Sequence, residues 1–263
     1  MRSPEQSERI YRLWDEGTDG NACQAEAAGF HLMKTVCGWM DADNAFWVGA
    51  VRMVRGVAAR RDTQHGWRGR VVRHWRKSPE ISRQARLAIQ TQETEPAMTT
   101  TAITARAGVF RAHRLHDGFV DLAQFRRTAH HRIFYESAGV SDRMWIVFPV
   151  NADAESYFCF DRYRRAKKFS RTELELAAFV LRGVKWFHRQ LMLHHGLPVA
   201  GVAFTAAEQK ILSLLLTDKS EKEIARELGR SFHTTHRHIS EIFRKFGVNS
   251  RAGLMALWLG GAK

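Results

Sequence analysis

The sequence predicts two domains of different fold class: an α+β domain in which helices flank an antiparallel sheet, then an all-α domain of four helices that includes a helix-turn-helix. Three observations support this division. Aromatic and β-branched runs alternate with helical periodicity over most of the chain, helix caps follow one another near its end, and an uncharged Gly/Pro segment lies between. We therefore assign residues 1–195 to the first domain, 196–203 to a linker and 204–263 to the second domain.

The composition fits a globular chain with a sizeable core, because 44% of the 263 residues are apolar and 11% are aromatic. No run approaches the roughly 18 apolar residues that a membrane helix needs, and the N-terminus lacks the apolar region of a signal peptide. We expect a cytoplasmic protein with no membrane partner. Cys23, Cys37 and Cys159 lack metal-site spacing and are expected to be buried free thiols.

Capping boxes mark the first two helices of the second domain. Thr205 and Ser220 each precede a carboxylate, Glu208 and Glu223, by three residues, which is the spacing of reciprocal caps. The second of these helices ends at Gly229, and about three residues separate it from the next helix. This spacing predicts a helix-turn-helix.

The third helix of this domain has two contrasting faces. One face is expected to be buried and recurs at i, i+4, i+7 and i+11: Thr235, Ile239, Ile242 and Phe246. The opposite face, His233, Arg237, Ser240 and Arg244 with His236 and Glu241 beside it, offers donors that reach bases and phosphates from a major groove. An ordinary solvated face is an equally good interpretation for this helix taken alone.

The fourth helix is expected after a left-handed Gly247 and a capping Ser250. Its body is apolar all round, so one side should pack inward and the other against a partner. The expected dimer contacts are Leu254, Leu257 and Trp258.

These residues together resemble the LuxR-type (GerE-like) C-terminal DNA-binding domain of bacterial transcription regulators. The resemblance covers Phe204–Gly260, and many ordered positions at fixed spacing make it specific. Its anchors are Leu212, Ser220, Lys222, Glu223, Ile224, Ala225, Leu228, Ser231, Thr234, His238, Ile242, Lys245, Gly247, Val248, Ser250 and Arg251.

The resemblance implies that the third helix enters the major groove, that the fourth helix dimerises, and that the partners are double-stranded DNA, a second copy of the chain and RNA polymerase. Base contacts fall by position on His236, Arg237 and Ser240, and backbone contacts on Lys222, Thr234 and Lys245. These positions and further residues of the third helix together form the predicted DNA-binding set: Lys222, His233, Thr234, Thr235, His236, Arg237, Ser240, Arg244 and Lys245. His236 replaces a lysine usual in the family, which removes a constant positive charge near neutral pH.

The net charge of +14 lies mainly outside this domain, because residues 203–263 hold ten Lys/Arg against six Asp/Glu. Arg52–Arg86 contains eleven Lys/Arg and two acids, and a second basic run covers Arg162–Lys168. Such segments attract polyanions, although a solvated surface without a partner is the favoured interpretation.

The N-terminal domain reads as alternating helices and strands around a Thr-rich loop at Thr91–Thr104. Helices are expected at Pro4–Trp14, Ala22–Met40, from Ser78 onward, at Asp121–Ala138 and, opened by a capping box at Ser170 and Glu173, to about His194. Strands are expected at Phe46–Met53, Trp67–Trp75, Val109–His116, Met144–Val150 and Tyr157–Tyr163, with the first two adjacent and the last two forming a hairpin.

This order resembles GAF or PAS sensor domains by architecture alone. A phosphoacceptor receiver domain is less well supported because its acidic residues and lysine are missing. The acyl-homoserine-lactone sensor of many LuxR-type proteins stays open, although its aromatic and Asp signature is not matched. Candidate pocket residues are the aromatic strand residues Trp47, Trp67, Trp75, Trp145, Phe148 and Phe158, for which an ordinary core position is the alternative.

No histidine set has metal-site spacing, and no phosphate loop, nucleophile motif or carboxylate pair indicates a cofactor or catalysis. We therefore expect no enzyme, cofactor or metal. The sequence predicts a dimeric DNA-binding transcription regulator whose N-terminal domain senses a small molecule or partner. The alternatives are an acyl-homoserine-lactone quorum-sensing receptor, a ligand-independent nucleic-acid-binding protein, and an enzyme that uses DNA binding only for placement.

Overall fold

The computed structural model describes residues 3–18, 24–94, 97–164, 167–197 and 204–259. It contains two compact units, one of residues 30–185 and one of residues 1–29 with 186–263. Most of the predicted linker and Cys23 lie outside the described residues. The division into 1–195, 196–203 and 204–263 stays a prediction.

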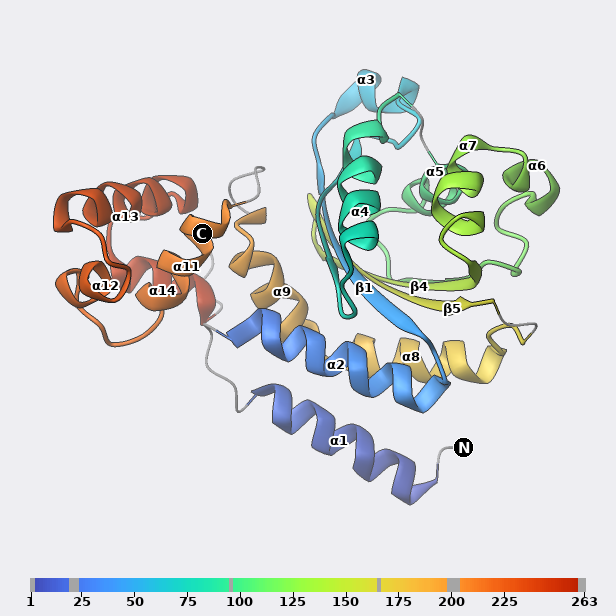
Figure 1. Ribbon diagram of the computed structural model, residues 1–263, viewed down its shortest axis with the longest axis horizontal. Coiled ribbons are helices and arrows are strands. Elements are labelled where there is room, and N and C mark those ends of the chain that lie inside the picture. The colour runs from blue at the N-terminus through green and yellow to red at the C-terminus, as the bar shows by residue number, and fades with distance from the viewer. Residues whose placement is uncertain (1–2, 19–23, 95–96, 165–166, 198–203, 260–263) are drawn as a thin grey trace. The chain divides into compact units, whose positions relative to one another are not determined.

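The unit of residues 30–185 is built on an antiparallel five-stranded sheet in the order β2-β1-β5-β4-β3 (Figure 1). The predicted pairing of the first two strands and the predicted hairpin of the last two are confirmed. The strands are β1 (Asn44–Arg52), β2 (Trp67–His74), β3 (Arg111–Arg114), β4 (Val140–Asn151) and β5 (Ala154–Tyr163).

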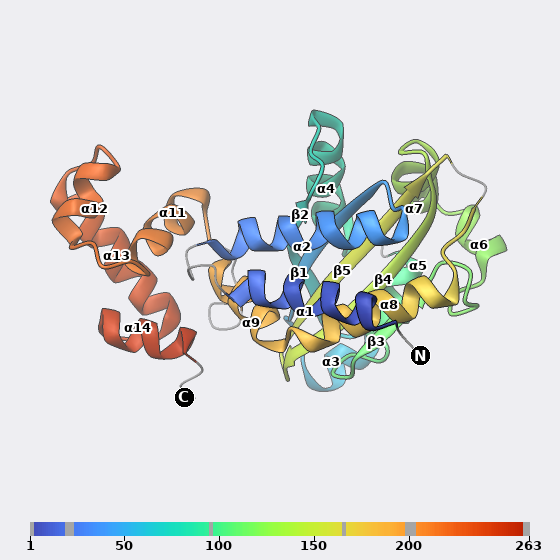
Figure 2. The ribbon, with the colours of Figure 1, turned by 90° about the horizontal axis from the view of Figure 1, so that it is seen from below.

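Helices cover both faces of this sheet, as the predicted GAF/PAS-like α+β class requires. Figures 1 and 2 show α8 (Arg171–Gly183) and α2 (Ala25–Met40) on one face, and α4 (Pro79–Thr91), α5 (Met98–Thr104) and α7 (Ala129–His131) on the other. Covering on both faces explains why β5 is buried along almost its whole length and why its sequence does not alternate between apolar and polar residues.

Two expectations about helices in this unit are wrong, and one further helix was not expected. The Thr-rich segment is not a loop throughout, because α5 forms within it and buries Thr99, Ile103 and Thr104. The unexpected helix, α3 (Gly56–Arg61), lies in the connection between β1 and β2. The helix expected at Asp121–Ala138 is divided into α6 (Leu122–Arg126), α7 and the π-helix η2 (Arg132–Glu136), because Thr128 caps a new start by accepting from the backbone N of His131 at 3.1 Å.

The expected long helix to about His194 is also divided, into α8 and α9 (Lys185–His194). The break lies at Val184, whose backbone (φ −101°, ψ 47°) is not helical. The preceding Gly183 weakens the helix, and the buried Val184 side chain is 3% exposed. The capping box of Ser170 and Glu173 at the start of α8 is confirmed.

The other unit contains α1 (Pro4–Thr18), the first turn of α2, α9 and the four helices after residue 204. These four are α11 (Ala206–Leu215), α12 (Glu221–Glu227), α13 (Phe232–Phe246) and α14 (Arg251–Trp258). Leu193 of α9 and Phe204 belong to the same apolar cluster as Ile211, Ile239 and Phe246. The predicted four-helix all-α domain is therefore confirmed, and α9 contributes to its core.

Cys37 and Cys159 are buried and free, as predicted. In the part of the chain that the structure describes, no helix has the length and apolarity to cross a membrane.

Candidate functional site

Local capping places α13, the third helix of the C-terminal domain. Ser231 caps its start by accepting from the backbone N of Thr234 at 3.1 Å, and Gly247 ends it in the left-handed conformation, at φ 63°. The capping boxes of Thr205 with Glu208 and of Ser220 with Glu223 fix α11 and α12 in the same way. The sequence therefore positions each of these helices through contacts that span three or four residues.

The two faces of α13 separate as predicted. Thr235, Ile239, Ile242 and Phe246 are 0 to 1% exposed. The predicted DNA-binding set included Thr235, and this prediction is wrong because the Thr235 side chain is buried and cannot contact DNA. Thr235 lies in the core because it belongs to the apolar stripe that repeats at i, i+4 along the helix. The exposed face consists of His233, His236, Arg237, Ser240 and Arg244.

Acidic neighbours engage most of the basic side chains on and beside this face. The Nδ1 atom of His236 lies 2.8 Å from an oxygen of Glu221, and Arg244 donates to Glu241 at 2.7 Å. Arg237 forms no ion pair with any residue that the structure describes. Its exposed guanidinium thus keeps its donors for a molecule outside the chain.

Lys245 differs from His236 and Arg244, because the carboxylate that it pairs with is buried. It donates to Glu208 of α11 and lies 5.2 Å from the centre of the Phe204 ring. Burial acts to raise the pKa of Glu208, but hydrogen bonds from Lys245 and Thr205 outweigh burial and lower it. Lys245 therefore ties α13 to α11.

Two further predicted contacts lie at helix starts, Lys222 in the first turn of α12 and Thr234 in the first turn of α13. Lys222 is exposed on α12, and the Thr234 hydroxyl is 2.8 Å from that of Ser231. The sequence analysis missed Phe232, which is 49% exposed and stacks on His236 with ring centres 6.0 Å apart. The sequence contained one signal for this residue, namely an aromatic side chain at the first position of an otherwise polar helix face.

The predicted dimer contacts lie in the core. Leu254, Leu257 and Trp258 are 0, 9 and 7% exposed and pack with residues of α11 and α13. This side of α14 turns inward because it joins one apolar cluster with residues of α11, α12 and α13. Its outward side consists of Ala252, Ala256 and Leu259, with Leu259 85% exposed and Met255 half-buried beside them.

A second candidate site is a cavity of about 400 Å³ between the sheet and α4, α5 and η2. Two of the candidate pocket residues, Trp67 and Trp145, line it. Trp47 and Phe158 are fully buried on the opposite face, since neighbours along a strand alternate: Phe46 and Val48 face the cavity, and Trp47 donates to Ser156 at 2.8 Å. Phe148 and Trp75 do not line the cavity either.

One end of this cavity is polar. Arg143 donates to both oxygens of Asp161, at 2.5 and 2.8 Å, and its guanidinium lies over the rings of Phe46 and Tyr135, at 4.7 and 4.6 Å. The Tyr135 hydroxyl is buried without a hydrogen-bond partner among the described residues. Burial raises the pKa of Tyr135 to about 12, so this group is a neutral donor.

Two histidines of the cavity are also uncharged near neutral pH. Burial, reinforced by the positive charge of Arg143, lowers the pKa of His74 and of His130 to about 3. His74 stacks on Phe46 with ring centres 4.7 Å apart. The cavity therefore combines aromatic walls with neutral hydrogen-bonding groups at one end.

Helix α4 forms a loose wall over this cavity. None of its residues is fully buried, although Ile81, Ala85, Ala88 and Ile89 face the cavity at helical spacing. An apolar helix face that is not buried lacks packing partners. A molecule bound beneath it would supply them.

Comparison with known proteins identifies the C-terminal region. The family described as "Bacterial regulatory proteins, luxR family" (GerE) matches residues 202–257. The spore germination protein GerE of Bacillus subtilis (strain 168) is 44% identical over 48 residues, which amount to 18% of this chain and span 65% of that relative's length. The predicted LuxR-type helix-turn-helix domain is therefore confirmed.

Solved structures similar to the chain include SdiA in complex with octanoyl-rac-glycerol, at 13% identity and a TM-score of 0.47, covering 100% of this chain and 98% of that chain. The VqsR LBD domain from Pseudomonas aeruginosa is 12% identical with a TM-score of 0.43, covering 72% and 95%. Escherichia coli SdiA is 16% identical with a TM-score of 0.40, covering 90% of each chain.

Proposed function

Because residues 202–257 form a luxR-family helix-turn-helix domain, we propose that this chain is a transcription regulator that binds double-stranded DNA as a homodimer in the cytoplasm, with RNA polymerase as a partner. The observation that carries the proposal is the outward face of α13, where Arg237 is exposed and unpaired within the described chain. A helix of this kind, preceded by a short turn, is the element that enters a major groove.

Within this proposal Arg237 reads a base, most favourably guanine, because a guanidinium matches the two acceptors on the guanine edge. His236 and Ser240 lie beside it, and His233 and Arg244 extend the same face. Lys222 and Thr234 contact the DNA backbone. Lys245 has a structural role through Glu208 and is withdrawn from the DNA-contacting set.

Replacing Arg237 with alanine tests this assignment. Affinity for the selected operator should fall by about 1 to 3 kcal/mol, and affinity for random DNA by less, because only the base contact is sequence-dependent. The operator is first obtained by selection from a random DNA pool, and binding is measured by competition. Lys210→Ala, which removes one exposed charge from α11, is the matched control and should leave discrimination unchanged.

A different outcome would favour the alternative of a ligand-independent nucleic-acid-coating protein. That protein would show steep salt dependence with little sequence discrimination, and Arg237→Ala would weaken operator and random DNA equally. The basic segment Arg52–Arg86 is the feature that supports this alternative.

The dimer contact is proposed on the outward side of α14, namely Ala252, Met255, Ala256 and Leu259, instead of the buried side. A two-fold dimer places half-sites about 10 base pairs apart and gives a pseudo-palindromic operator of roughly 20 base pairs. Footprinting should show symmetric protection of both half-sites at full occupancy.

We also propose that the cavity beneath α4 binds a small molecule that changes operator affinity. Its shape and lining suit a mainly apolar ligand with one polar end against Tyr135 and the Arg143–Asp161 pair. A ligand acts only through different affinities for two states, and a useful coupling of about 1 to 3 kcal/mol changes operator affinity about 5- to 150-fold. Mass spectrometry of molecules that co-purify with the chain, with acyl-homoserine lactones among the standards, identifies its class.

A further inference from the structure

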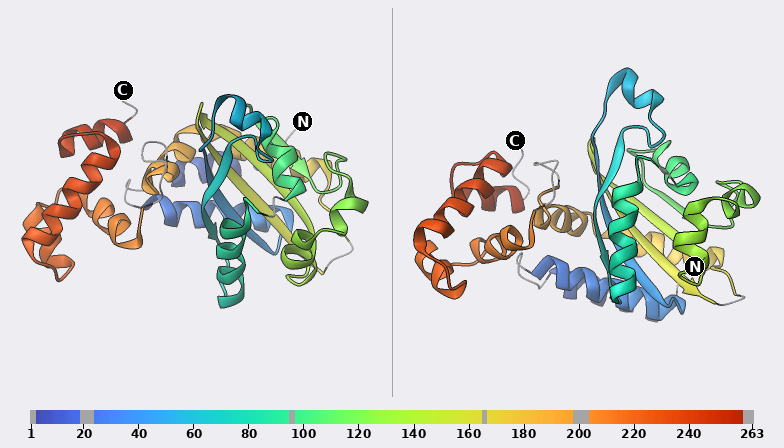
Figure 3. Two further views of the ribbon diagram at one scale, coloured as in Figure 1. Left: turned by 90° about the horizontal axis from the view of Figure 1, so that it is seen from above. Right: turned by 45° about the horizontal axis from the view of Figure 1, so that its top comes forward.

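Strand β2 lies at one edge of the sheet, and a groove of about 450 Å³ runs between this strand and α4. Figure 3 shows α4, the teal helix, beside this part of the sheet. Arg70, Val71, Val72, Arg73 and His74 all line the groove. Consecutive strand residues point to opposite faces, so a groove that meets all five follows the strand edge itself.

The chain already pairs one residue of this edge with a side chain that imitates a neighbouring strand. The backbone N of Gly69 donates to the Gln92 carboxamide oxygen at 2.9 Å, and the Gly69 carbonyl accepts from the Gln92 carboxamide nitrogen at 3.1 Å. These are the two bonds that a residue of an adjacent antiparallel strand would make. Gln92 is held by a further bond to the Ile89 carbonyl at 2.9 Å.

The edge continues past Gly69 into the groove. The backbone N of Trp75 donates to Ala45 of β1, so by alternation the main-chain groups of Val72 and His74 point away from β1. The Val72 carbonyl accepts from the guanidinium of Arg73 at 3.1 Å, a side-chain contact that a strand could replace. The outward main chain of β2 therefore has room for a sixth strand.

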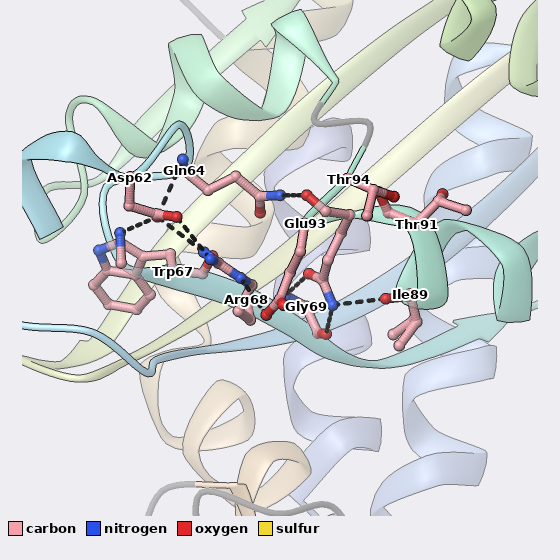
Figure 4. A network of polar contacts seen from close by, with 11 residues as sticks. Asp62, Gln64, Trp67, Arg68, Gly69, Ile89, Thr91, Glu93 and Thr94 are labelled. Carbon is pink, nitrogen blue, oxygen red and sulfur yellow. Dashed lines mark hydrogen bonds and ion pairs between the residues drawn. The ribbon is translucent and has the colours of Figure 1, made fainter. Parts of the chain in front are cut away.

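The positive charge of the groove favours an added strand with acidic side chains. Arg70, Arg73, Lys77 and Arg86 line it, and no Asp or Glu among the residues that the structure describes does. The nearby acids within the described part of the chain are engaged elsewhere: Asp62 and Glu93 neutralise the buried Arg68, at 2.7 and 3.0 Å (Figure 4), and Glu80 pairs with Arg83. Basic edges repel each other, which disfavours a second copy of this edge and favours an acidic partner.

We propose that this groove binds an extended acidic segment of another protein, which adds to the sheet as a strand beside β2. Alternate acidic side chains of the segment pair with Arg70 and Arg86, and the residues between them, small and apolar, pack on Ile81, Ala85 and Ile89 of α4. A nucleic acid satisfies the charges but cannot form the main-chain ladder. Regulation of the chain by a partner protein would then act through the unit of residues 30–185, independently of the cavity ligand.

The test uses the full chain and a fluorescein-labelled peptide of four Glu-Val repeats, followed by fluorescence anisotropy. The peptide should bind, whereas a Lys-Val peptide should not. The double variant Arg70→Ala/Arg86→Ala should weaken binding about tenfold, and Arg70→Lys/Arg86→Lys should restore most of it. Arg83→Ala removes the same charge from α4 outside the groove and should leave binding unchanged. Circular dichroism checks that each variant is folded.

A second peptide separates strand addition from simple charge attraction. N-methylation of alternate residues keeps all four carboxylates but removes the donors that face the strand, so affinity should fall at least tenfold in one of the two registers. Equal binding by both N-methylated peptides, the same loss with Arg83→Ala, or no binding of the Glu-Val peptide would each overturn the proposal. Competition by random double-stranded DNA that depends on Arg70 and Arg86 would assign the groove to nucleic acid instead.

Discussion

Helix α13 and the paired strands β4 and β5 carry their charges in opposite environments. On α13 the charged residues Arg237 and Arg244 lie in water, and Arg244 pairs with Glu241 at the surface. In the hairpin, Asp161 and Arg162 are 1 and 0% exposed, and Arg143 reaches Asp161 through two hydrogen bonds. The same residue types are therefore exposed at the surface in one region and form internal cross-links in the other.

This contrast changes how the basic composition is interpreted. Arg162, expected within a basic surface run, is buried, donates to the Met40 carbonyl at 2.6 Å and Glu173 at 2.7 Å, and lies over Phe169. Arg68 is buried between Asp62 and Glu93. Part of the positive charge counted in the sequence thus holds elements together and does not meet polyanions.

The largest expected difference between the two regions comes from removing one partner of the hairpin pair. Arg143→Ala leaves Asp161 buried and uncompensated, which should lower the free energy of unfolding by about 3 to 5 kcal/mol. Urea denaturation of the full chain measures the loss. Arg244→Ala, which breaks an exposed pair on α13, is the control and should leave the unfolding midpoint unchanged. Equal losses of unfolding free energy in the two variants would contradict the difference between the buried pair and the exposed pair.

The next expected effect concerns the neutral histidines of the cavity. The pKa of His74 and of His130 is about 3 in the folded chain against 6.5 without burial, so the unfolded chain binds more protons below pH 6.5. The stabilisation that comes from keeping these two histidines neutral is fully present above pH 6.5 and decreases as the pH falls toward 3. Lowering the pH from 7 to 5 should therefore reduce the free energy of unfolding by about 1 to 2 kcal/mol for each histidine.

The test variant is His74→Phe, which keeps the stacking on Phe46 and cannot titrate. The control variant is His233→Gln on the exposed face of α13. The first should remove about half of the pH-dependent loss attributed to the two histidines, and the second should remove none. Denaturation curves recorded at both pH values decide this, and an unchanged slope for His74→Phe would mean that His74 is solvated.

The smallest expected effect is on dimerisation, and it distinguishes the outward side of α14 from the inward side. Leu259→Asp introduces a charge on the outward side and should weaken dimerisation about tenfold while leaving the unfolding midpoint of the domain nearly unchanged. Leu257→Ala on the inward side should instead destabilise the domain by about 2 to 5 kcal/mol. Sedimentation equilibrium and thermal unfolding report the two quantities, and a dimer that tolerates Leu259→Asp would exclude this surface.

The sequence by itself determined the elements of the C-terminal domain. Ser231, Gly247 and the two capping boxes act on backbone groups within one helical turn, and the buried stripe of α13 repeats with the period of the helix. Such signals depend on neighbours three or four residues away, so they can be read without the tertiary structure. The β4–β5 hairpin was also predictable from its short connection, and the pairing of β1 with β2 from their succession in the chain, because consecutive strands usually lie side by side.

The tertiary structure decided which side of each apolar element faces a cavity, a core or a partner. Trp145 lines the cavity and Phe158 does not, because the register between strands distant in sequence, such as Val48 opposite Tyr157, sets their faces. The core surrounding α14 likewise takes up Leu257 and Trp258 and leaves Leu259 outside. The pairing of Arg143 with Asp161 and the division of the long helix at Val184 depend on burial and packing, and burial is a property of the assembled fold.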